Sequence, residues 1–120
     1  MRTRSLSFIS SLALLLLFGS VTAHAHALLD RADPRVGSTV KAAPREVSLF
    51  FTENLEPTFS TVEVTNDTGQ RVDEGKPSID GNVMRLPLRA IPPGTYRVKW
   101  HVLSVDTHTT EGGFSFKVQP

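Results

Sequence analysis

Apolar and polar side chains alternate along most of the chain beyond residue 45, and this period of two is typical of half-buried β-strands. Proline lacks the backbone donor that a central strand needs, so Pro87 predicts an edge strand or a bulge for its segment. Turn-forming residues separate the alternating runs. The predicted strands lie around residues 46–52, 61–65, 84–88, 96–102 and 114–118, and the turns lie at Asp33-Pro34, 66–69, 80–82 and 92–94.

No segment beyond the first 25 residues has the 3.6-residue period of an amphipathic helix. About seven short strands at this spacing predict an all-β fold, either a two-sheet β-sandwich or a small barrel. We expect Trp100 to be the central aromatic of the core and Met84 to fill a gap in it. Phe50 interrupts the polar side of its strand, which indicates that this face is partly covered.

The N-terminal segment has the features of a secretory signal peptide. Two arginines stand among the first four residues, residues 12–18 form an apolar centre, and Ala23-His24-Ala25 matches an export peptidase site. The apolar run is shorter than the roughly 20 residues that a membrane-spanning helix needs. The sequence therefore predicts a cleaved signal peptide over residues 1–25 and one exported, soluble domain over residues 26–120.

Charge and composition are those of an ordinary globular domain. The chain has 13 basic and 12 acidic residues. This balance argues against a nucleic-acid-binding protein, which needs a basic surface to bind phosphates. It contains no cysteine, which excludes disulfides, thiolate zinc sites, iron–sulfur clusters and a cysteine-ligated blue-copper centre. Hydrolase, metalloprotease and phosphate-loop motifs are absent, so we expect a binding protein rather than an enzyme.

The histidines carry the most specific chemistry. Cleavage after Ala25 would leave a mature chain that begins with His26 and contains two other histidines, His101 and His108. An N-terminal histidine can hold one metal ion through its α-amine and its ring Nδ1 together. Both groups release protons to a metal near neutral pH, because their usual pKa values are about 8 and 6.5. His101 lies among charged residues on the polar strand face, where we expect it to be solvated.

Asp106-Thr107-His108 is the second candidate element, since a carboxylate and an imidazole two residues apart share one face if the segment is extended. This spacing alone is common in proteins. The alternative interpretation is a polar loop before the final strand, with Gly112-Gly113 providing flexible backbone at the strand entry.

Together, the amine, two imidazoles and a carboxylate form a donor set that suits Cu(II), with Ni(II) second. Thioether ligands for Cu(I) are nearly absent, because Met84 is the only methionine beyond the signal peptide. Cleavage after Ala23 is an alternative. It would create a start of His24-Ala25-His26, which could bind Cu(II) locally through the amine, two backbone amides and one ring.

The sequence resembles the CopC family of small copper-binding proteins of the bacterial periplasm, over nearly all of residues 26–120. The matching motifs are His26-Ala27-Leu28-Leu29, Ala32-Asp33-Pro34, residues 49–55, Pro93-Gly94-Thr95-Tyr96, Trp100, residues 104–108 and residues 111–116. The resemblance implies an immunoglobulin-like or cupredoxin-like Greek-key sandwich or barrel. It also implies that His26, Asp106 and His108 bind Cu(II), with Glu53 as a further candidate ligand.

Other family members hold Cu(I) in a methionine-rich loop, whereas the comparable residues 56–79 contain no methionine here. The chain is therefore identified as a Cu(II)-only member. The resemblance further implies a periplasmic role in copper homeostasis or resistance, in which the protein sequesters or carries copper. It also implies delivery to a CopD-like copper transporter of the inner membrane.

Two other functions fit parts of the pattern. An N-terminal histidine with a second histidine also resembles the copper brace of polysaccharide monooxygenases. Those enzymes are usually larger, and Asp106 would occupy a position that oxygen chemistry needs open. The third interpretation is a metal-free sandwich for adhesion or envelope assembly, whose melting temperature would not respond to copper.

Overall fold

The computed structural model describes residues 27–120, so the predicted signal peptide and His26 lie outside the described residues. The described chain consists of β-strands and one short 3-10 helix, and no helix in it is long and apolar enough to cross a membrane. In order, the elements are β1 (Leu29–Asp33), β2 (Thr39–Val40), β3 (Glu46–Phe51), η1 (Pro57–Phe59), β4 (Thr61–Thr65), β5 (Ser78–Asp80), β6 (Val83–Pro87), β7 (Gly94–Leu103) and β8 (Thr109–Val118).

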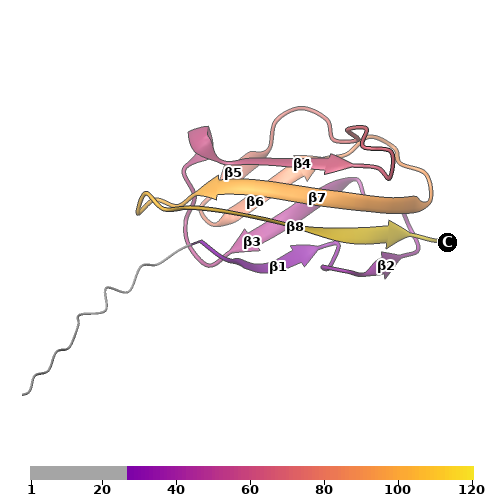
Figure 1. Cartoon of the computed structure of the whole chain (residues 1–120), viewed down its shortest axis with the longest axis horizontal. Helices are drawn as coiled ribbons and strands as arrows, with labels where there is room; N and C mark the ends of the chain where they lie inside the picture. The colour runs from indigo at the N-terminus through magenta and orange to yellow at the C-terminus, as the bar shows by residue number, and fades with distance from the viewer. Residues whose placement is uncertain (1–26) are drawn as a thin grey trace, which may run out of the picture.

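The strands form two four-stranded sheets, with the orders β1-β3-β6-β5 and β2-β8-β7-β4. Every pairing is antiparallel except that of β2 with β8. Figure 1 shows the two sheets as layers, with the long β7–β8 hairpin spanning the molecule. One buried apolar cluster draws residues from both sheets. The prediction of an all-β sandwich is therefore confirmed.

The core is built from the inward positions of the alternating strands. Trp100 is 9% exposed, and its ring meets Phe51 of the opposite sheet edge to face, with centroids 5.1 Å apart. Met84 is completely buried. The expectations for Trp100 and Met84 are confirmed. Phe50 is covered as its position indicated, because the Arg31 guanidinium lies over its ring at 3.7 Å from the centroid.

The prediction for Pro87 is wrong in one respect. β6 is an internal strand, between β3 and β5. Pro87 is its last residue and pairs with Glu46 of β3, while β5 pairs only with the earlier part of β6, as far as Arg85. The missing donor therefore lies where β5 has already ended, and an internal strand tolerates it.

The interpretation of Gly112-Gly113 as a flexible strand entry is also wrong. β8 already begins at Thr109, so both glycines lie inside the strand. A Cβ atom on Gly112 would lie 2.5 Å from Cζ2 of Trp100, and one on Gly113 would lie 2.9 Å from the Val98 carbonyl oxygen. The glycines are thus required by close packing rather than by flexibility.

A buried carboxylate fixes the segment that follows β4. Asp73 is 8% exposed, and its Oδ2 accepts the Val64 N–H at 2.8 Å. The Arg71 guanidinium donates to both of its carboxylate oxygens, at 2.8 and 2.9 Å. Burial raises the pKa of Asp73, but the hydrogen bonds from Arg71 and Val64 and the charge of Arg71 outweigh it and lower that pKa below its ordinary value.

We expect this carboxylate to make the fold sensitive to acid. Because its pKa is lower in the folded state, the stabilisation is complete above the unfolded pKa of about 3.9 and is lost as the pH falls through the folded pKa. Asp73→Asn should cost about 1.5 kcal/mol at pH 7, since charged hydrogen bonds contribute about 1.5–3 kcal/mol and Arg71 is half exposed. Urea unfolding at pH 7 and pH 3 measures both effects. If the unfolding free energies of variant and wild type differed by the same amount at pH 7 and pH 3, Asp73 would not be the source of the acid sensitivity.

Candidate metal centre

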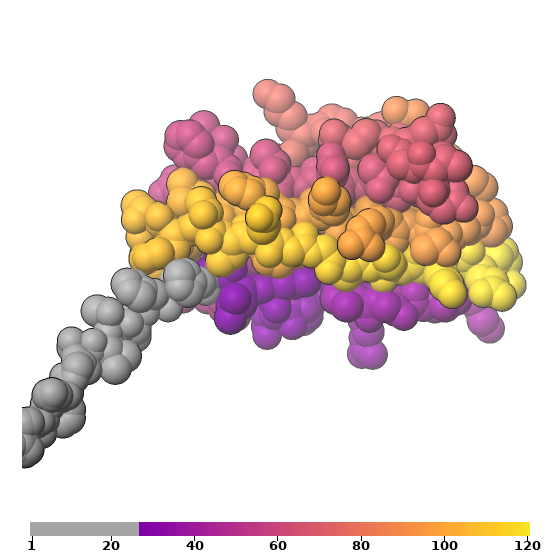
Figure 2. All heavy atoms as spheres, viewed as in Figure 1, coloured from indigo at the N-terminus to yellow at the C-terminus, as the bar shows by residue number. Residues whose placement is uncertain are grey.

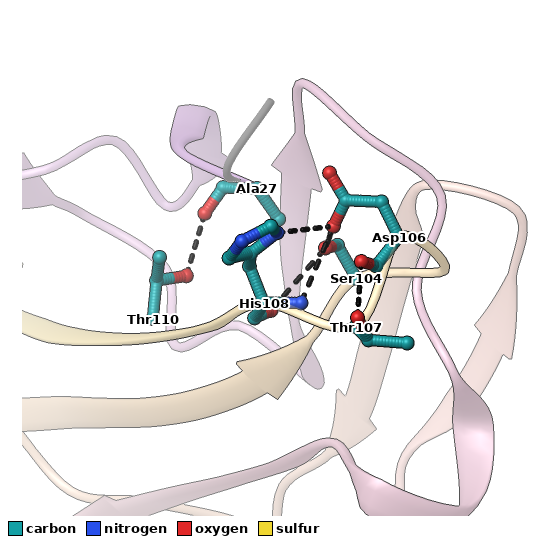
Figure 3. Close-up of polar contacts among 6 residues, drawn as sticks. All are labelled: Ala27, Ser104, Asp106, Thr107, His108 and Thr110. Atoms are coloured by element: carbon teal, nitrogen blue, oxygen red, sulfur yellow. Dashed lines mark hydrogen bonds and ion pairs between the residues drawn. The ribbon is translucent and has the colours of Figure 1, made fainter. Parts of the chain in front are cut away.

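The candidate site lies in the connection between β7 and β8, at one end of the sandwich (Figure 1), and Figure 3 shows its polar contacts. The hairpin ladder closes with the pair Leu103 and Thr109. Ser104 follows and is completely buried. It forms an isolated bridge with Leu55, and the next residue, Val105, donates its N–H to the Asn54 carbonyl at 3.0 Å. The connection is therefore fastened to the segment that follows β3.

The backbone between the two predicted ligands is a tight turn, not the extended segment that the sequence interpretation assumed. Thr107 has a φ of +74°, which is rare for a β-branched residue and costs about 1–3 kcal/mol. Its N–H donates to the Ser104 carbonyl at 2.9 Å. The turn brings the side chains of Asp106 and His108 into contact. In an extended strand, the same two side chains would point to one face but lie farther apart.

Asp106 and His108 are in direct contact. His108 Nδ1 lies 3.2 Å from Asp106 Oδ1, and the two side chains are 36% and 33% exposed. The buried Ser104 hydroxyl also donates to Asp106 Oδ1. That hydrogen bond lowers the pKa of Asp106; partial burial opposes it, and the hydrogen bonds and charge of His108 lower it further. Asp106 is thus a carboxylate at neutral pH, oriented towards an imidazole.

The start of the described chain is fastened beside this pair. Ala27 is completely buried, and its carbonyl accepts the Thr110 hydroxyl at 2.6 Å. Leu28 exchanges two hydrogen bonds with Thr52, from Leu28 N to Thr52 Oγ1 at 3.0 Å and from Thr52 N to the Leu28 carbonyl at 2.9 Å. Figure 3 shows the hydrogen bond between Thr110 and Ala27 together with the contacts of Asp106 and His108, and in Figure 2 the start of the described chain meets the β7–β8 end at the surface.

The other sequence-predicted residues are placed differently. His101 is exposed on the outward face of β7, opposite Glu111. It lines a surface hollow of about 460 Å³ that includes neither Asp106 nor His108. Glu53 is half-buried in the bend after β3. Among residues 27–120, no three His, Asp or Glu side chains are grouped so that they could hold a metal ion. The structure therefore gathers Asp106 and His108 but does not add Glu53 to them.

Sequence reasoning missed the two hydroxyl residues that support the site, Ser104 and Thr110. A signal for Thr110 exists in the strand pattern. The inward positions of β8 run from Val118 through Phe116 and Phe114, all buried, and continue to Gly112 and Thr110 by the period of two. A hydroxyl at an inward position needs a hydrogen-bond partner, which here is the Ala27 carbonyl.

Fold and site together define a small β-sandwich with a carboxylate–imidazole pair at one end, and both side chains are of types that can bind metal ions. The chain belongs to the CopC family: residues 29–119 match the CopC domain. Protein YobA of Escherichia coli K12 is 38% identical over 104 residues, covering 83% of this chain and 82% of that protein. Copper resistance protein C of Xanthomonas campestris pv. juglandis is 35% identical over 109 residues, covering 83% and 85%. The chain is thus a copper-handling protein, in agreement with the expectation of a binding protein rather than an enzyme.

Solved structures agree with this assignment. The crystal structure of CopC from Methylosinus trichosporium OB3b has a TM-score of 0.71 at 33% identity and covers 79% of this chain and 95% of its own. PcoC, a methionine-rich copper resistance protein from Escherichia coli, has a TM-score of 0.70 at 35% identity, covering 79% and 100%. Copper transport protein CutJ of Bacillus subtilis is 33% identical over 111 residues; the match covers 89% of this chain but only 20% of CutJ.

Proposed function

We propose that the chain is an exported periplasmic protein that binds Cu(II) through His26, Asp106 and His108, and that it sequesters or carries the ion for copper homeostasis or resistance. One observation carries the proposal. Asp106 and His108 are in contact at 3.2 Å, and Ala27, the residue after His26, is hydrogen-bonded to the strand directly beyond them. The residue whose amine export would free is therefore joined directly to a residue that is held close to the pair, which supports its role as a ligand.

The spacing of the two donor atoms suits one shared ion. First-row metal ions bind imidazole nitrogen at about 2.0 Å, so ligand atoms at adjacent corners of a square lie about 2.8 Å apart. Asp106 Oδ1 and His108 Nδ1 are 3.2 Å apart, so a small side-chain movement would let both bind the same ion. Glu53 could bind the same ion only if the bend that carries it moved, because Glu53 is not grouped with Asp106 and His108 among the described residues.

The donor types favour Cu(II). Amine, imidazole and carboxylate ligands suit tetragonal Cu(II), and Cu(II) binds such ligands more tightly than other divalent first-row ions do. Soft ligands for Cu(I) are lacking, since the chain has no cysteine and residues 56–79 contain no methionine. Met84 is completely buried in the core. Reduction to Cu(I) would therefore release the ion from this site.

We propose a CopD-like copper transporter of the inner membrane as the receiving partner. CutJ supports this proposal, because it is named a copper transport protein and the segment similar to this chain makes up only a fifth of it. The signal-like first 25 residues support export to the periplasm.

Electron paramagnetic resonance of Cu(II) tests the proposal. Protein processed to begin at His26, with one equivalent of Cu(II), should give a single tetragonal signal with nitrogen hyperfine splitting, because amine and imidazole nitrogens would bind the ion. A matched sample whose N-terminal amine is acetylated should lose part of that splitting, since acetylation removes the amine as a donor. A spectrum of free or heterogeneous copper in the protein that begins at His26 would overturn the proposed function.

A further inference from the structure

The hydrogen bond between Thr110 and Ala27 joins residues 83 positions apart in sequence. Thr110 is the second residue of β8 and lies two residues after His108, which stands directly before the strand. Ala27 is completely buried, and a buried carbonyl needs a donor. The Thr110 hydroxyl supplies it at 2.6 Å. One side chain thus fixes the start of the fold directly beside the candidate ligand.

We infer that Thr110 is a positioning residue of the copper site: its hydroxyl holds the N-terminal arm, defined here as Ala27 and Leu28, so that His26 reaches the ion bound by Asp106 and His108. This inference rests on the proposed function. Ala27 would be bonded directly to the proposed ligand, and consecutive Cα atoms are only about 3.8 Å apart. Binding an arm that is already fixed costs less conformational entropy than binding a free one.

A second contact of the arm is weaker evidence for positioning. Leu28 and Thr52 exchange two hydrogen bonds, but Leu28 is 59% exposed, so water can replace these bonds at little cost. Water cannot replace the hydrogen bond to the Ala27 carbonyl in this way unless Ala27 leaves its buried position. Without the Thr110 hydroxyl, we expect the arm to move outward so that this carbonyl can meet water.

Thr110→Val tests the inference, because valine keeps the shape of threonine and lacks the hydroxyl. Thr110→Ser restores the hydroxyl, and Thr109→Val is the matched control on the exposed side of the same strand. All proteins begin at His26. Competition with a chelator of known Cu(II) affinity should show about tenfold weaker binding for Thr110→Val, the lower end of losses from outer contacts of metal sites. Thr110→Ser and Thr109→Val should bind as the wild type does.

Two spectroscopic readouts separate positioning from general destabilisation. Cu(II)-loaded Thr110→Val should lose nitrogen hyperfine splitting, because the His26 nitrogens bind less completely. In the metal-free protein, the Leu28 amide should exchange with solvent faster in Thr110→Val and at the wild-type rate in Thr110→Ser. Thr52→Val, at an exposed position, should change the affinity less than Thr110→Val does, and it provides a folded comparison if Thr110→Val is poorly stable.

The outcomes distinguish the two proposals. If the wild type gives only the spectrum of free copper, the proposed function fails, and the role of Thr110 fails with it. If the wild type shows the tetragonal signal and Thr110→Val matches it in affinity and spectrum, only the inference about Thr110 is overturned. A loss in Thr110→Val that Thr110→Ser does not restore would also overturn it, because the hydroxyl would then not be the cause.

Discussion

Replacing His108 with alanine should weaken Cu(II) binding by about 100-fold or more. Loss of an outer contact to a metal ligand already costs about 10–100-fold, and His108→Ala removes a proposed ligand itself. It also leaves Asp106 without the imidazole that lies 3.2 Å from its Oδ1. Chelator competition at pH 7, with protein that begins at His26, measures the effect.

His101→Ala is the matched control for that measurement. It removes the same side chain from the exposed face of β7, away from Asp106, and should leave the affinity unchanged. Asp106→Asn adds a test of charge. Its amide oxygen can still accept the Ser104 hydroxyl, which preserves the turn, but it brings no negative charge to the ion. Wild-type affinity in His108→Ala, or an equal loss in His101→Ala, would remove the proposed site.

The two candidate ligands, Asp106 and His108, can be picked out from the sequence, whereas the geometry that joins them cannot. Asp106 and His108 were identified by residue type and spacing, on the assumption of an extended segment. The structure reaches the same pairing through a turn in which Thr107 has a positive φ. A β-branched residue gives no local signal for that conformation. The Thr107 N–H donates to the Ser104 carbonyl, and Ser104 in turn forms a bridge with Leu55 from a distant segment.

The same division applies to the fold. Strands with regular alternation, such as β7 with its burial at every second position, were predictable because one face is buried. β2 and β5 contain two and three residues, too few to show any period. β1 is mostly exposed, with burial at Ala32 alone, so its pairing with β3 rather than its pattern makes it a strand. Such elements depend on tertiary pairing that local sequence does not encode.

The second large effect is expected for Gly112→Ala, which should destabilise the fold by about 3 kcal/mol, near the upper end for overpacking a core. Gly112 pairs with Trp100 across the β7–β8 ladder, and a Cβ atom there would lie 2.5, 3.0 and 3.2 Å from three ring carbons. The ring cannot retreat easily, because it is 9% exposed and packs against Phe51. Relief therefore requires movement of the strand itself.

Urea unfolding of Gly112→Ala, compared with Gly94→Ala, measures this effect. A Cβ atom on Gly94 would meet its nearest neighbour, the Tyr96 hydroxyl oxygen, at 3.7 Å, which is ordinary contact, so this control should change the unfolding free energy by less than about 1 kcal/mol. The strand that would move also carries Thr110, whose hydroxyl donates to the Ala27 carbonyl. Gly112→Ala should therefore weaken Cu(II) binding as well as the fold. If Gly112→Ala were as stable as Gly94→Ala, Trp100 would not be held as tightly as its contacts with Gly112 and Phe51 indicate.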